Sequence, residues 1–137
     1  MSANTLIVAA GVVVRENRVL LTQRKKGGHL EGLWEFPGGK VEANEDPRAG
    51  LVRELEEELG IQTLAGEILD VTFHHYADVN RSVLLLFFAA ALTPTSPAPS
   101  ALDVAAFRWA SAVDLATLSF PAADLGIVRK VASMLAL

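Results

Sequence analysis

Residues 38–61, GGKVEANEDPRAGLVRELEEELGI, restrict the fold of this chain more than any other stretch. Asp46 can cap a helix by accepting hydrogen bonds from free backbone N–H groups. Pro47 suits the first helical position, where a missing N–H costs nothing. Gly60 is the usual kind of residue just past a helix end. The stretch therefore predicts a helix from about Pro47 to Leu59, directly after a glycine turn.

This helix carries an apolar arc beside an acidic arc, at about 100° per residue. The apolar arc contains Leu51, Val52, Leu55 and Leu59, and the acidic arc contains Glu54, Glu57 and Glu58. A solvated surface face is the alternative reading. However, like charges at i and i+4 destabilise a helix by roughly 0.2–0.5 kcal/mol, and no Lys offsets them here. Because hard cations such as Mg²⁺ prefer clustered carboxylates, the acidic arc predicts a metal site, and the Gly38-Gly39 turn can bring a backbone carbonyl close to the cation.

The stretch resembles the Nudix box of the MutT/Nudix hydrolases, G-x5-E-x7-R-E-U-x-E-E-x-G-U, where U is aliphatic. Every fixed position matches at the required spacing: Gly39, Glu45, Arg53, Glu54, Leu55, Glu57, Glu58, Gly60 and Ile61. The resemblance implies an α+β fold, the Nudix α/β/α sandwich. A mixed sheet would lie between the box helix and a C-terminal helix. Residues 1–137 would form a single Nudix hydrolase domain.

Outside this stretch, the residue pattern favours short strands and a terminal helix. Periodicity and turn signals predict strands at residues 6–14, 19–23, 33–36, 67–76, 81–92 and 105–109, and helices at 111–117 and 122–137. The Pro-rich residues 93–100 predict a surface loop. This order of strands and helices is typical of an α+β fold.

Length, charge and cysteine content limit the possible functions. A chain of 137 residues has the length of one domain. The net charge of −4 argues against polymeric nucleic acid as a partner. The absence of cysteine excludes disulfides and thiolate catalysis and fits a cytoplasmic location. No signal peptide is visible, and the apolar run at residues 83–92 is too short to span a membrane. We expect a cytoplasmic monomer or homodimer.

The resemblance also implies roles for residues inside the box. The implied Mg²⁺ ligands are Glu57, Glu58 and Glu54, with help from the Gly38 carbonyl, and Mn²⁺ is an alternative ion. Glu54 is either a ligand or the base that activates water. Arg53 is expected to orient a glutamate. These assignments give Glu54, Glu57 and Arg53 as the candidate catalytic residues. Glu45 is expected to complement the positive end of the helix dipole.

Further candidates lie outside the box. Asp103 stands six places before Trp109, where MutT-like enzymes carry another acidic metal ligand. The implied substrate-binding residues are Arg24, Phe36, Arg81 and Asp124. Asp124 stands where the family has an Asn that contacts a purine base. The alternative is that Asp124 only complements the dipole of the last helix.

The resemblance implies an enzyme that binds a small nucleotide and needs Mg²⁺. The expected activity is nucleoside triphosphate pyrophosphohydrolysis of the house-cleaning type, converting nucleotides such as 8-oxo-dGTP to a monophosphate and pyrophosphate. The alternatives are hydrolysis of CTP or modified dCTP, or of another nucleoside diphosphate derivative such as ADP-ribose. A dinucleotide polyphosphate is a further alternative, because Nudix enzymes that cleave diadenosine polyphosphates carry a Tyr at about the distance of Tyr76 from the box. A non-catalytic nucleotide-binding module is disfavoured because the box is intact.

Overall fold

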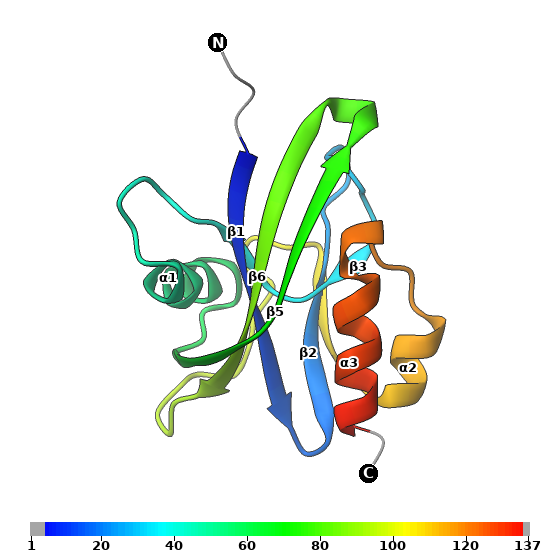
Figure 1. Ribbon diagram of the computed structural model, residues 1–137. Coiled ribbons are helices and arrows are strands. Elements are labelled where there is room, and N and C mark those ends of the chain that lie inside the picture. Colours follow the sequence, from blue (N-terminus) through cyan, green and yellow to red (C-terminus); the bar gives the residue numbers. More distant parts are fainter. Residues whose placement is uncertain (1–4, 136–137) are drawn as a thin grey trace.

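The computed structural model describes residues 5–135, which form a mixed sheet between helical layers (Figure 1). The strands are β1 Thr5–Arg15, β2 Arg18–Gln23, β3 Trp34–Glu35, β4 Gly38–Lys40, β5 Thr63–Tyr76, β6 Arg81–Leu92 and β7 Ala106–Ala110. The helices are α1 Pro47–Leu59, α2 Ala112–Thr117 and α3 Leu125–Leu135, with 3₁₀ turns η1 Ala77–Val79 and η2 Ala122–Asp124. Helix α1 covers one face of the sheet, and α2 and α3 cover the other. The predicted α/β/α sandwich is confirmed.

The sheet is mixed because β1 runs parallel to β6 but antiparallel to β2 and β4. The strand order is β3-β2-β1-β6-β5, with β4 also paired to β1 and β7 to β2. In the pairing with β4, Ala9 lies opposite Gly39 and Ala10 opposite Gly38. The central strand therefore fixes the position of the glycine turn that leads into α1.

Strand β1 contributes to two apolar cores because successive side chains of a strand point to opposite faces. The core under α3 includes Ala10, Val12, Phe87, Ile127 and Val131. The core under α1 includes Ala9, Val13, Leu51, Leu55 and Leu59. A Cβ on Gly11 would lie 3.4 Å from the Leu51 side chain, a van der Waals distance, so α1 packs directly on β1 at this point.

The ends of α1 are the predicted ones. The Asp46 carboxylate accepts a hydrogen bond from the Arg48 N–H at 2.8 Å. Gly60 adopts a left-handed conformation with φ 69°, and its N–H donates to the Glu56 carbonyl at 2.9 Å. Since the leucines of the apolar arc are fully buried, the acidic arc turns toward β4.

The last helix and the strand β5 differ most from their predicted extents. The last helix begins at Leu125, because residues 122–124 form η2, and residues 136–137 lie outside the described residues. Strand β5 begins at Thr63, earlier than predicted, and register shifts between Ala65 and Asp70 interrupt its alternation. Among residues 5–135, no helix has both the length and the apolar character that crossing a membrane requires.

Candidate active site

Arg53 connects three glutamates beside β4. Its Nε donates to Glu45 Oε2 at 2.8 Å, and its Nη1 donates to Glu54 Oε1 at 3.0 Å and Glu57 Oε1 at 3.3 Å. Its Nη2 donates to the Lys40 carbonyl at 3.2 Å. Arg53 therefore fixes the carboxylates of α1 relative to the end of β4.

Glu45 has a different structural role from the predicted one. The Arg53 hydrogen bonds, together with the backbone N–H of Glu42, hold the pKa of Glu45 at about 2. A Cβ on Gly50 would lie 2.8 Å from Glu45 Oε1, so the glycine leaves room for this carboxylate. Because Asp46 caps the helix, Glu45 acts by anchoring Arg53 and not by complementing the dipole.

Gly38 and Gly39, at the start of β4, both lie against the acidic arc. A Cβ on Gly39 would lie 2.4 Å from the Glu54 carboxylate, and the Gly38 N–H donates to Glu58 Oε1 at 3.3 Å. Burial raises the pKa of Glu54. Burial, reinforced by the nearby Glu35 carboxylate, raises the pKa of Glu58 to about 8. The carboxylates of the acidic arc therefore repel one another when ionised, and a bound cation would reduce this repulsion.

Two cavities of the described chain meet at Glu58. The first has a volume of about 240 Å³, and its lining includes Arg24, Glu35, Phe36, Gly38, Glu58 and Asp124. The second has a volume of about 230 Å³, and its lining includes Arg24, Lys25, His29, Glu35, Glu58 and Asp103. The fold therefore brings most of the predicted site residues to these adjoining hollows.

The predicted base-contacting residues lie deep in the first cavity. Asp124 is 4% exposed, and burial, reinforced by Glu35, raises its pKa to about 7. Phe36 is buried, with its ring stacked on Phe120 at 6.3 Å and edge-on to Phe87 at 6.0 Å. Asp124 precedes α3 within η2. Its burial in this cavity fits the base-contact prediction better than the dipole role.

Other predicted residues lie further out. Arg81 lines neither cavity and pairs with Tyr76 at the end of the β5–β6 hairpin. Glu57 also lines neither cavity, and its side chain is 56% exposed. Asp103 lines the second cavity and forms an ion pair with Lys25. The structure thus brings Glu58, Asp103 and Asp124 together but leaves Arg81 apart.

Glu35 is a site residue for which the sequence predicted no role. Its Oε1 lies 3.3 Å from Arg24 Nε, and burial raises its pKa. A charged residue inside the short strand between Trp34 and Phe36 was the available signal.

Tyr76 is half-buried, and burial together with the nearby Asp124 carboxylate raises its pKa. Its ring contacts His74 at 4.4 Å and, edge-on, His29 at 5.0 Å. His75 instead bonds Ser82 through Nδ1 at 2.9 Å. The two adjacent histidines thus have separate structural partners.

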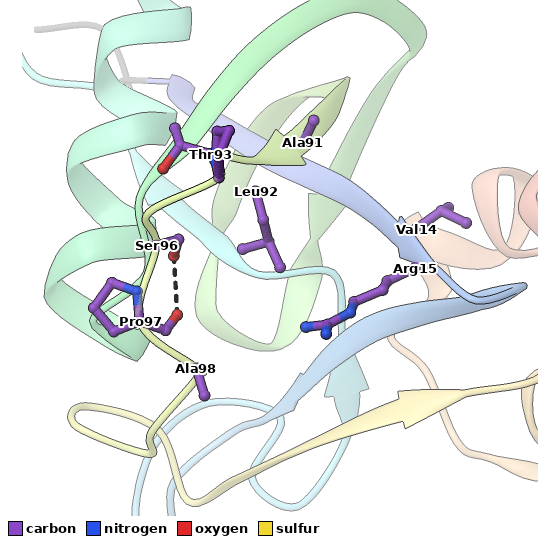
Figure 2. A pocket seen from close by; sticks show the side chains of 9 residues that line it. Val14, Arg15, Ala91, Leu92, Thr93, Ser96, Pro97 and Ala98 are labelled. Carbon is purple, nitrogen blue, oxygen red and sulfur yellow. Dashed lines mark hydrogen bonds between the residues drawn. The ribbon is translucent and has the colours of Figure 1, made fainter.

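A larger cavity, of about 600 Å³, shares no lining residue with these two (Figure 2). It lies between the Pro-rich loop and the ends of β1 and β6, and Arg15 reaches into it. The Ser96 hydroxyl steadies the loop by donating to the Pro97 carbonyl at 2.9 Å. This cavity contains none of the predicted site residues.

The donor set of the acidic arc suits a hard divalent cation, because it offers carboxylate oxygens and the Gly38 backbone. The raised pKa of Glu58 fits this interpretation, since a bound ion would favour the ionised form. Within residues 5–135, no group of three or more His, Cys, Asp or Glu side chains has the arrangement of a metal site. The glutamates bonded to Arg53 would have to turn to bind an ion.

The fold and this helix define a protein class. Residues 5–131 match the NUDIX domain, and the chain belongs to the Nudix hydrolase family, whose members are generally dependent on divalent metal. The chain is 37% identical over 129 residues to a putative 8-oxo-dGTP diphosphatase 2 of Mycobacterium tuberculosis, covering 94% of this chain and 89% of that protein. A CTP pyrophosphohydrolase of Escherichia coli is 52% identical over 60 residues, which are 44% of each chain. The solution structure of the E. coli ORF135 protein superposes with a TM-score of 0.78 at 32% identity, covering 96% of this chain and 90% of that chain.

Proposed function

We propose that this Nudix hydrolase is a nucleoside triphosphate pyrophosphohydrolase of the house-cleaning type. It converts nucleotides such as 8-oxo-dGTP to a monophosphate and pyrophosphate. The observation that carries the proposal is one cavity whose lining includes Glu58 of the acidic arc and Asp124 before α3. A nucleotide whose base contacts Asp124 would have its phosphates near the carboxylates. The similarity to the M. tuberculosis protein supports the same substrate class.

The proposed metal ligands are Glu54, Glu57, Glu58, the Gly38 carbonyl and Asp103. Mg²⁺ is the expected ion and Mn²⁺ the alternative. When bound, the ion supplies charge neutralisation at the pyrophosphate and acidifies a bound water. Arg53 keeps Glu54 and Glu57 in position through the bonds described above. Glu54 is the proposed ligand or base, and its raised pKa makes its carboxylate a better proton acceptor.

The proposed nucleotide contacts are Arg24, Phe36 and Asp124. Arg24 offers a cation between the two cavities, where it already pairs with Glu35. Phe36 offers an apolar wall for a base. Arg81 is left out of this set because it lines neither cavity.

A second candidate function is hydrolysis of CTP or a modified dCTP. It is favoured by the similarity to the E. coli CTP pyrophosphohydrolase, although the match covers only 44% of each chain. An ionised Asp124 would accept a hydrogen bond from the N4 amino group of cytosine. Both candidates therefore involve the same cavity and differ in the base.

A hydrolysis screen with Mg²⁺ tests the proposal. The substrates are 8-oxo-dGTP, dGTP, CTP, ADP-ribose and a dinucleotide polyphosphate, with EDTA as the control. We expect the highest kcat/KM for 8-oxo-dGTP, or for CTP under the second candidate, and no turnover with EDTA. A preference for ADP-ribose or the dinucleotide would contradict both candidates.

A further inference from the structure

The loop of residues 24–33, between β2 and β3, contacts distant parts of the chain through its side chains. Lys25 Nζ forms an ion pair with the Asp103 carboxylate. His29 Nε2 lies 3.0 Å from Asp78 Oδ2. Both Lys25 and His29 line the second cavity, beside Glu58. The loop thus reaches the acidic arc through its own side chains.

Asp103 is fixed to the end of α1 by its backbone. The Asp103 and Leu102 N–H groups both donate to the Glu58 carbonyl, at 3.1 Å and 3.0 Å. The Asp103 carboxylate therefore stays beside the acidic arc even though its side chain is 61% exposed. This placement fits its proposed role as a metal ligand.

The second cavity contains more carboxylates than free cations. Its lining includes Glu35, Glu58 and Asp103, against Arg24 and Lys25. Arg24 already pairs with Glu35 at 3.3 Å, so Lys25 is the cation that compensates Asp103. The Lys25 side chain is 58% exposed, and an exposed ion pair of this kind adds little stability. It is therefore easily broken by a competing cation.

We propose that Lys25 is an internal cation that holds Asp103 in the metal-free enzyme and leaves it when a divalent ion binds. Lys25 thereby weakens metal binding and couples it to the position of the loop. The inference rests on the proposed function, because it takes Asp103 as a metal ligand. A lysine suits this exchange since its ammonium is a compact charge on a flexible stem.

Mn²⁺ binding to the full-length chain tests the proposal without nucleotide, with free Mn²⁺ followed by electron paramagnetic resonance. We expect Lys25→Met to bind Mn²⁺ about 1.5-fold to fivefold more tightly than the wild type, the range for loss of an exposed ion pair. The matched control is Lys26→Met, the same charge change on the same loop. Lys26 is exposed and takes part in no ion pair among residues 5–135. Its Kd should stay close to that of the wild type.

A second comparison isolates the exchange at Asp103. Asp103→Asn should weaken Mn²⁺ binding, and adding Lys25→Met to that variant should change the Kd no further. Unchanged or weaker binding by Lys25→Met would overturn the proposal, as would the same gain in the Asp103→Asn background. If the wild type hydrolyses nucleotides but Lys25→Met binds Mn²⁺ no more tightly, the role of Lys25 is wrong and the proposed function stands. A wild type that binds no Mn²⁺ overturns both.

Discussion

Glu57→Gln is expected to lower kcat by about 100-fold or more, because a metal site contributes several kcal/mol to transition-state stabilisation. The amide keeps the size of the side chain but loses the charge that a cation needs. The Glu57 side chain is 56% exposed and, among residues 5–135, its carboxylate bonds only Arg53, so the fold should remain intact. Steady-state kinetics at saturating Mg²⁺, with a thermal melt of the same sample, measures both effects.

Glu56→Gln is the matched control for this substitution. Glu56 is an exposed glutamate on the same helix, directly beside Glu57 but outside the acidic arc. Its kcat should stay within about twofold of the wild type, since an exposed charge outside the site contributes little. Near wild-type turnover of Glu57→Gln, or an equal loss in both variants, would contradict the assigned metal site.

Asp124→Asn is expected to change the ratio of kcat/KM between 8-oxo-dGTP and CTP by about tenfold or more, since one paired group contributes on the order of 1.4 kcal/mol. An amide donates and accepts at any pH, whereas a carboxylate only accepts and a carboxylic acid also donates. Parallel assays of both substrates measure the ratio. An equal loss of kcat/KM for both substrates, or no loss for either, would contradict base contact and indicate that Asp124 has a structural role beside α3.

The pH dependence of the wild type provides a second readout for Asp124. Its pKa is raised to about 7, so its ionised fraction increases as the pH rises through neutrality. The ionised form accepts from the cytosine amino group and repels the O6 acceptor of guanine. The preference should therefore shift toward CTP as the pH rises, and Asp124→Asn should lose most of this shift. A shift of the same size in the variant would assign it to another group.

The box helix was predictable because its signals are local. Asp46, Pro47 and Gly60 define its ends within a few residues of sequence, and the leucine spacing defines its buried face. The final helix was less predictable. It begins later than residue 122, because η2 occupies residues 122–124. Leu125, its first residue, is 46% exposed, and its buried face consists of Ile127, Val128, Val131 and Leu135.

The contacts within the site depend on tertiary structure and could not be predicted from local sequence patterns. Lys25 and Asp103 are 78 residues apart, and no periodicity links them. The ionisation of Asp124 was also unpredictable, because its raised pKa comes from burial and from Glu35 on another strand. With a pKa of about 7, Asp124 is present in both ionised and neutral forms near neutral pH, so it can contact either guanine or cytosine.

Phosphorus NMR of the first products tests the central claim most directly. The enzyme is incubated with Mg²⁺ and the triphosphate that it hydrolyses fastest, and the spectrum is followed from the earliest turnover. The proposed pyrophosphohydrolysis predicts nucleoside monophosphate and pyrophosphate in equal amounts, and no reaction with EDTA. Orthophosphate and nucleoside diphosphate as the first products would contradict it.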